Sequence, residues 1–133
     1  MKIFDCTTFY SEHLMMDVRF NTLNKHVHKF IVTESTFSHS GKPKKLNFDI
    51  NHYPKFKDKI IYVVIDKEPN NIIKAGDRLL TTVEKRSNSL KRIELSYDHM
   101  ANSLDEALDD DLIILSDNDE IPNLDSIKFK SSN

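Results

Sequence analysis

The clearest chemical signal in the sequence is a group of acids that directly follows an apolar run. Leu112–Leu115 is continuously apolar and is followed, after one serine, by Asp117, Asn118 and Asp119. In extended backbone, residues two apart point to the same side, so Asp117 and Asp119 would present two carboxylates to one point. Two carboxylates this close repel unless a proton or a cation lies between them. The spacing therefore favours a hard divalent ion, Mg²⁺ or Mn²⁺, which would in turn bind phosphate oxygens.

Three other interpretations of this segment compete with a metal site. An EF-hand calcium loop that starts at Asp117 needs Gly at its sixth position and Glu at its twelfth, but Pro122 and Lys128 stand there, which excludes it. A phosphatase of the haloacid dehalogenase type carries its Asp-X-Asp near the start of the domain, with further residues of the site after it. Only 14 residues follow Asp119, which argues against a phosphatase. A surface turn that caps a final helix stays open as an alternative, because Asp and Asn are common in turns and caps.

Three more acids, Asp5, Glu34 and Asp66, stand at or next to the predicted ends of strands. Ligands of open α/β sheets bind beyond the carboxyl ends of the strands, so a parallel sheet would bring these carboxylates to one edge. Glu34 has the position of an acid that accepts hydrogen bonds from a ribose. No Gly-X-Gly-X-X-Gly and no P-loop is present, so a nucleotide held through metal and ribose fits better. Turn formation explains any single acid more simply.

Two basic residues are candidates for binding phosphate. Arg86 interrupts the apolar stripe of a long helix whose first turns we expect near the carboxyl edge of the sheet. Lys42 lies in a glycine-containing loop with two further lysines. For Arg86 the alternative is an arginine that extends from a half-buried face to water. For Lys42 the alternative is a solvated run of charge.

The elements that must position these residues alternate between strands and helices, which predicts an α/β fold around a mostly parallel sheet with helices over its faces. The last two strands are continuously apolar, as in strands buried on both faces. The predicted strands are Lys2–Asp5, Lys29–Glu34, Ile60–Ile65 and Asp111–Leu115, and the predicted helices are Glu12–His28, a long helix from about Asp77, and a last turn within Leu124–Phe129.

Each of the two main predicted helices has an apolar stripe at helical spacing, which we expect to face the sheet. In the first, the stripe is Leu14, Val18 (or Met15), Leu23 and Val27. In the second it is Val83, Leu90, Tyr97 and Leu104, seven residues apart, and a break is expected near Asp98 and His99. Beside these residues, Ile93, Met100 and Ala107 recur at the same spacing and belong to the same stripe.

The composition indicates an ordinary globular protein. Its 133 residues argue for one domain, with 38% apolar and 30% charged residues. The net charge of −2 gives no general electrostatic reason to bind nucleic acid or an anionic membrane. Cys6 is the one cysteine, which rules out an internal disulfide. No apolar run is long enough to span a bilayer and no signal peptide is recognisable, so we expect a cytoplasmic location.

Five segments, in this order along the chain, match a known family: Lys2–Glu12, Lys29–Ser35, Phe37–Lys44, Lys59–Asp66 and Leu115–Pro122. They resemble glycosyltransferase family 17, whose best-known members are β-1,4-mannosyl-glycoprotein β-1,4-N-acetylglucosaminyltransferases. The strand that runs into Asp-X-Asp-Glu-Ile-Pro is the most specific part of the resemblance.

The resemblance implies a GT-A-like, Rossmann-related fold that binds a nucleotide-sugar donor, with UDP-N-acetylglucosamine expected, together with Mn²⁺ or Mg²⁺. It also implies transfer with inversion to a hydroxyl of a glycan or other acceptor. By position, Asp117 and Asp119 would bind metal and diphosphate or ribose, with Asn118 between them among the substrate-binding residues. Asp5 and Glu34 would lie in the nucleoside-binding half, and Lys42 would come from the glycine loop. Arg86 stands one position away from an arginine of the family.

Family members continue beyond the Asp-X-Asp into an acceptor-binding half, so we expect residues 1–133 to be a donor-binding domain that is truncated relative to the family. Inverting transfer needs a base at the acceptor hydroxyl, and the acids that follow Asp119, Glu120 and Asp125, have no support as that base. The alternative is a non-catalytic nucleotide- or metal-binding module, or a fragment, completed by a partner chain or by self-association.

Overall fold

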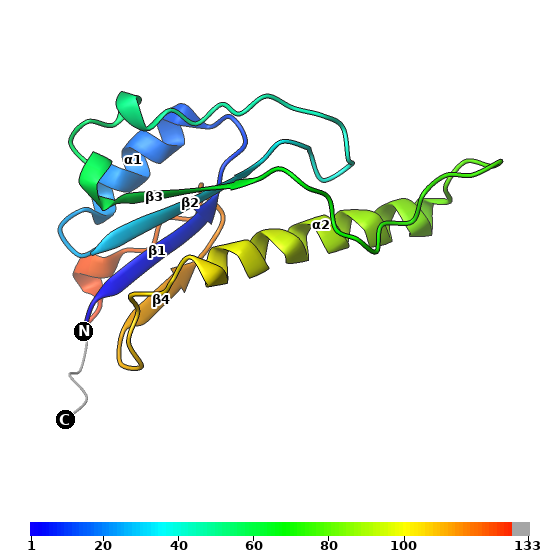
Figure 1. The fold of residues 1–133 in the computed structure, drawn as a ribbon. Helices are drawn as coiled ribbons and strands as arrows, with labels where there is room; N and C mark the ends of the chain where they lie inside the picture. Colours follow the sequence, from blue (N-terminus) through cyan, green and yellow to red (C-terminus); the bar gives the residue numbers. More distant parts are fainter. Residues whose placement is uncertain (129–133) are drawn as a thin grey trace.

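The computed structural model describes residues 1–128, in which a four-stranded sheet is flanked by two helices (Figure 1). The predicted α/β fold is confirmed. The predicted last turn is a 3₁₀ turn at Leu124–Ser126, and Phe129 lies outside the described residues. The elements are β1 (Ile3–Thr8), α1 (His13–Leu23), β2 (Lys29–Ser35), β3 (Ile60–Ile65), α2 (Thr82–Asn102) and β4 (Leu112–Leu115).

The sheet is parallel throughout, with the strand order β3-β2-β1-β4. This is the order of the first four strands of a Rossmann sheet. From β1 the chain adds β2 and β3 on one side and then crosses to add β4 on the other side, so the order switches between β1 and β4 while all strands stay parallel. Phe4 of β1 pairs with Lys29 of β2 on one side and with Ile113 of β4 on the other. β1 continues to Thr8, three residues beyond its predicted end, so Asp5 lies in the middle of this strand.

The two apolar strands predicted to be buried on both faces are the edge strands of the sheet. Val64 of β3 is exposed, as are Ile113 and Leu115 of β4. The prediction was wrong because a continuous apolar run does not reveal whether a neighbouring strand or helix covers it.

Helix α1 covers one face of the sheet, with a stripe that agrees with the predicted one only at Leu23. Met16, Phe20 and Leu23 are buried, whereas Leu14 is 79% and Val18 is 45% exposed. Both stripes have helical spacing, and tertiary contacts select the one that also contains the buried Arg19. The helix ends at Leu23, five residues before its predicted end.

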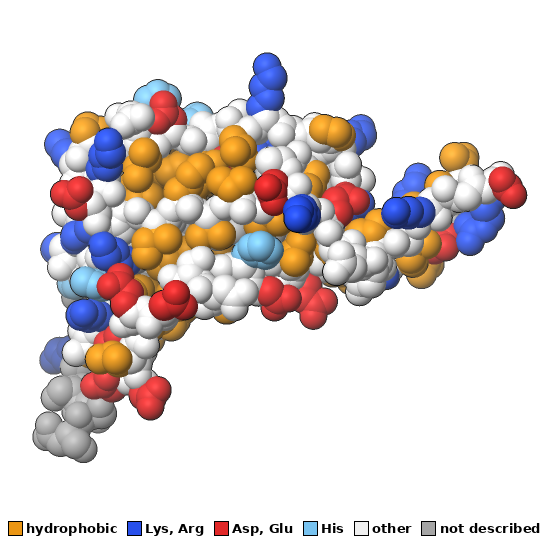
Figure 2. All heavy atoms as spheres, viewed as in Figure 1, with side chains coloured by type: hydrophobic (Ala, Val, Ile, Leu, Met, Phe, Trp, Pro, Cys, Tyr) orange, Lys and Arg blue, Asp and Glu red, His pale blue; other side chains and the backbone are white. Residues whose placement is uncertain are grey.

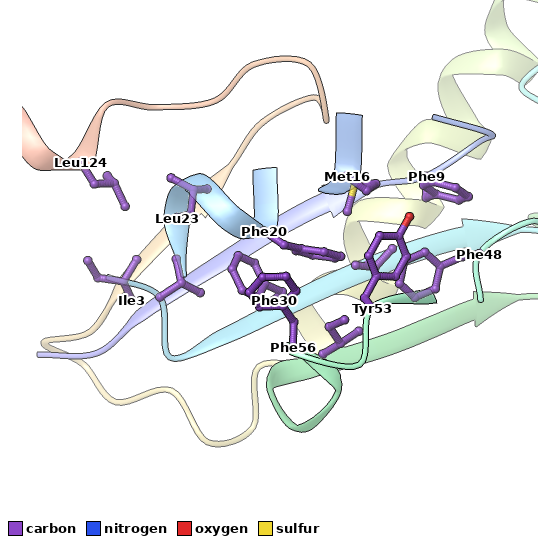
Figure 3. Packing of buried hydrophobic residues seen from close by; sticks show 13 residues of the cluster. Ile3, Phe9, Met16, Phe20, Leu23, Phe30, Phe48, Tyr53, Phe56 and Leu124 are labelled. Atoms are coloured by element: carbon purple, nitrogen blue, oxygen red, sulfur yellow. The ribbon is translucent and has the colours of Figure 1, made fainter. Parts of the chain in front are cut away.

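The main core lies between α1, the sheet and the segment 46–59, which joins the loop after β2 to β3. Phe20 packs against Phe30 of β2 and against Tyr53 of that segment, with ring centroids 4.8 and 5.0 Å apart (Figure 3). Phe48 stacks on Tyr53 at 5.4 Å. Edge-to-face and offset aromatic pairs of this kind stabilise a core beyond the area that they bury.

Helix α2 crosses the other face of the sheet and extends beyond it (Figure 1). It begins at a capping box, in which Thr81 Oγ1 accepts from the Glu84 amide and the Glu84 carboxylate accepts from the Thr81 amide. The helix is continuous to Asn102, so the expected break at Asp98 and His99 is absent.

Only part of the predicted apolar stripe of α2 faces the sheet. Met100 is buried against it as predicted, whereas Val83 is 78% exposed and Leu90 and Tyr97 are also exposed. The rest of the buried side includes the polar residues Arg92 and Ser96. Hydrophobic side chains therefore reach the surface along α2 as well as over the sheet (Figure 2). Among residues 1–128, no helix has the length and apolar character that crossing a membrane requires.

Candidate functional site

An open pocket of about 440 Å³ lies at the carboxyl edge of the sheet. It is at the point where the strand order reverses, between the residues that follow β1 and those that follow β4, which is where open α/β sheets bind ligands. Its walls come from residues within 8–15, residues within 33–44, Ser96 of α2, and Asp117 to Asp119. The volume is in the range of small-molecule sites.

Three carboxylates converge at one side of this pocket. Asp117, Asp119 and Glu120 each offer one oxygen, and these oxygens all lie within 4.8 Å of one another on exposed side chains. The structure thus brings together the two aspartates singled out from the sequence and adds Glu120 to them. A cluster of hard oxygen donors open to solvent is a donor set that suits Mg²⁺ or Mn²⁺.

The loop that carries the carboxylates is attached to the helix beneath it. Arg19 of α1 is fully buried and donates from Nη1 to the main-chain oxygens of Asp117 (3.0 Å), Asn118 (3.3 Å) and Glu120 (2.8 Å). Its Nη2 also donates to Ser116 Oγ at 2.6 Å.

Asp5 is the partner of Arg19 and is not available to a ligand. Its two carboxylate oxygens accept from Arg19 Nε at 2.7 Å and from Nη2 at 2.6 Å, and the residue is buried. The structure therefore places Asp5 under the site, as a support for Arg19, and not in the wall of a nucleoside pocket.

Glu34 is buried in a similar way. It accepts from Lys44 Nζ and Tyr62 Oη, each at 2.6 Å, and from the amides of Asn47 and Phe48. Burial alone would raise the pKa of Glu34, but these four donors outweigh it and hold the pKa below the ordinary value. With its oxygens occupied by the protein, Glu34 has no free position for a ribose hydroxyl.

The two basic candidates lie outside the pocket lining. Lys42 is exposed in the loop after β2, and Arg86 is exposed in the second turn of α2. The first turns of this helix extend beyond the sheet (Figure 1). The lysine that does line the pocket is Lys44, whose ammonium lies 5.1 Å from the centroid of the Tyr10 ring. Asp66, the acid that follows β3, is exposed and also lies outside this pocket.

Asn118 connects the acidic loop to the opposite wall. Its Nδ2 donates to Glu12 Oε2 at 2.9 Å and to the Thr8 main-chain oxygen at 3.3 Å. Burial would raise the pKa of Glu12, but the amides of Ser11 and Tyr10, its own amide and the Asn118 side chain lower the pKa. The side chain of Asn118 thus fixes the shape of the pocket.

Sequence reasoning missed several lining residues, including Tyr10, Glu12, His39 and Ser96. They come from a loop after β1, a loop after β2 and the middle of α2, so no local pattern connects them. Arg19 did leave a signal, because it lies within the stripe Met16, Phe20, Leu23, where a charged residue requires a buried partner.

Comparison with known proteins gives a consistent result. A model described as glycosyltransferase family 17 matches residues 1–132. A beta-1,4-mannosyl-glycoprotein 4-beta-N-acetylglucosaminyltransferase of Rattus norvegicus is 28% identical over 132 residues, which cover 96% of this chain and 23% of the relative. One of the same name from Homo sapiens is 30% identical over 119 residues, which cover 86% of this chain and 21% of the relative. The chain thus spans less than a quarter of the length of these relatives. No solved structure matches it significantly.

Proposed function

The chain belongs to glycosyltransferase family 17, and from this premise we propose that residues 1–128 form the donor-binding part of a glycosyltransferase. The ligand is a nucleotide-sugar bound together with a divalent metal ion. The observation that carries the proposal is the convergence of Asp117, Asp119 and Glu120 beside the pocket at the carboxyl edge of the sheet. Phosphate oxygens alone would be repelled by these three acids, whereas a metal–diphosphate complex is attracted to them.

Asp117 and Asp119 would hold the ion, with Glu120 as a third carboxylate. When bound, such an ion neutralises the charge that develops on the diphosphate as it leaves the sugar. The chain itself supplies the position of the donor, because the pocket has both polar walls and an apolar wall with Phe9, Met15 and Phe37. A nucleotide, with a charged diphosphate and a flat base, needs both kinds of wall.

The names of the two relatives suggest the finer assignment. Both are N-acetylglucosaminyltransferases that act on a mannosyl-glycoprotein, so we propose UDP-N-acetylglucosamine as the donor and a glycan hydroxyl as the acceptor, with inversion at the anomeric carbon. The base that deprotonates the acceptor is not assigned to any residue of this chain.

Calorimetric titration of UDP in the presence and absence of Mn²⁺ tests donor binding. We expect UDP to bind in a Mn²⁺-dependent way and Asp119→Asn to weaken that binding at least about tenfold, because one charged metal ligand is lost. The side chain is exposed, so the circular dichroism spectrum should not change. Asp66→Asn is the matched control, since it removes an exposed acid outside the pocket. Equal affinity in wild type and Asp119→Asn would contradict the metal assignment.

The same protein separates donor binding from catalysis. Hydrolysis of UDP-N-acetylglucosamine, or sugar transfer to a mannosyl glycan, is measured by release of UDP. Turnover would make this chain an enzyme in its own right. Mn²⁺-dependent binding without turnover would favour the alternative, a nucleotide-binding module that needs a partner chain for activity.

A further inference from the structure

A single buried arginine lies beneath the acidic loop and makes contacts with most of it. The guanidinium of Arg19 makes two hydrogen bonds to Asp5 and four to the segment 116–120, three of which go to main-chain oxygens. Arg19 is fully buried and Asp5 is 1% exposed. A charge this deep is tolerated only when its partners satisfy it, and here every N–H group of the guanidinium has a partner.

These hydrogen bonds hold the backbone of the loop and leave its side chains free. The main-chain oxygens of Asp117, Asn118 and Glu120 all accept from the same nitrogen, Arg19 Nη1, so the loop backbone curves around this atom. The carboxylates of the same loop lie on exposed side chains, with ligand oxygens within 4.8 Å of one another. Without a cation those carboxylates repel each other, and this repulsion favours a more open loop.

We propose that Arg19 is a positioning residue, which fixes segment 116–120 in the conformation that brings the three carboxylates together before a metal ion binds. Asp5 holds the guanidinium in plane through its bidentate pair and neutralises its charge. The expected effect of Arg19 on metal binding rests on the proposed function, which this inference deepens. An ordered loop loses less conformational entropy when it binds an ion, so preorganisation raises affinity.

The chemistry requires arginine at this position. Lysine offers a compact ammonium, which can pair with Asp5 but cannot bond to both carboxylate oxygens and to the loop in one plane. Arg19→Lys therefore keeps the charge and the buried pair while it releases the loop. A purely structural role in the core would instead affect the stability of the whole fold and leave the loop as it is.

The test compares wild type and Arg19→Lys by ¹⁵N relaxation on the metal-free chain. We expect the amides of residues 117–120 to have order parameters of about 0.85 in wild type and below about 0.6 in Arg19→Lys. The order parameters of β1 and β2 should be the same in both proteins. Arg92→Lys is the matched control, because Arg92 is also buried on a helix but bonds to Glu68 and to the His39 main-chain oxygen. An equally rigid loop in a folded Arg19→Lys chain would overturn the proposal.

A second variant covers the case in which Arg19→Lys does not fold. The pair Asp5→Asn with Arg19→Gln is neutral, so it leaves no unpaired buried charge. It removes the bonds to the loop, and we expect the same gain in loop mobility; a rigid loop would overturn the proposal. Titration with Mn²⁺ alone is a separate measurement, in which we expect about a tenfold loss of affinity in both variants. If wild type does not bind Mn²⁺, the proposed function fails, while the order parameters still decide the role of Arg19.

Discussion

At the scale of single residues, the acids of this chain belong to two groups that the sequence does not separate. Asp117, Asp119 and Glu120 are exposed and converge, while Asp5 and Glu34 are buried in ion pairs. Asp117 and Asp119 of the first group were predictable, because their spacing along one short segment places their carboxylates together, whereas Glu120 is added by the structure. The second was not, because the partners Arg19 and Lys44 come from other elements, and strand-end position alone suggested a ligand.

The buried pair of Glu34 predicts a dependence of stability on pH. Because the pKa of Glu34 in the folded chain lies below its ordinary value of 4.5, the unfolded chain takes up this proton more readily. The stabilisation is therefore complete above pH 4.5 and is lost as the pH falls through the lowered pKa. Urea unfolding of the wild type between pH 7 and about pH 3 should show this loss.

Glu34→Gln isolates the contribution of this carboxylate from that of other acids. We expect it to lower the free energy of unfolding at pH 7 by about 3 kcal/mol, since it leaves Lys44 without its buried partner. The gap to wild type should narrow as the pH falls below 4.5, because Glu34 of the unfolded wild type is then protonated, and should close as the pH falls through the lowered pKa of the folded chain. Glu94→Gln, an exposed acid on α2, should stay within about 0.5 kcal/mol of wild type. A gap that is constant with pH would contradict the assignment.

At the scale of elements, the existence and type of each main strand and helix could be predicted, but the buried faces of the two helices were predicted correctly only in part, at Leu23 and Met100. In α1 two stripes with helical spacing compete, and burial of Arg19 beside Asp5 selects Met16 and Phe20 over Leu14 and Val18. In α2 the buried side carries Arg92 and Ser96, which no hydrophobic pattern would choose. The predicted start of α2, at about Asp77, was too early, because the helix starts at Thr82. The capping box of Thr81 and Glu84 is the signal in the sequence that marks this start.

The buried face of α1 predicts the effects of two substitutions on stability. Phe20→Ala should lower the free energy of unfolding by about 3–5 kcal/mol, because it leaves a cavity among Phe30, Tyr53 and Phe56. Leu14→Ala should change it by less than about 0.5 kcal/mol, because that side chain is already in water. Urea denaturation of the two variants measures both values, and a loss for Leu14→Ala as large as that for Phe20→Ala would contradict this assignment of the buried face.

At the scale of the whole molecule, the parallel sheet and the edge that carries the site followed from the order of the elements. The order β3-β2-β1-β4 places β1 and β4 side by side, and this adjacency brings Tyr10 and Asp117 into one pocket. Strand order is set by long-range pairing, so it could not be read from local pattern. For the same reason β3 and β4 were predicted to be covered, although they are edges.

The sheet also leaves apolar surface on the side of α2. Ile113 and Leu115 of β4 and Tyr97 of α2 are exposed. Tyr97 and Leu115 line a common hollow with Asp117 and Glu120. The site thus borders a face that is only partly covered among the described residues. Since the chain spans less than a quarter of its curated relatives, activity and acceptor binding are properties to be measured on this chain directly.

The most direct test of the donor site is a crystal structure of the chain soaked with Mn²⁺ and UDP. The anomalous scattering of manganese distinguishes it from water and from lighter ions. We predict a manganese peak bound by Asp117 and Asp119, with the diphosphate on its open side and the nucleoside in the pocket between β1 and β4. A peak elsewhere, or carboxylates that point apart while UDP occupies another surface, would contradict the proposed donor site.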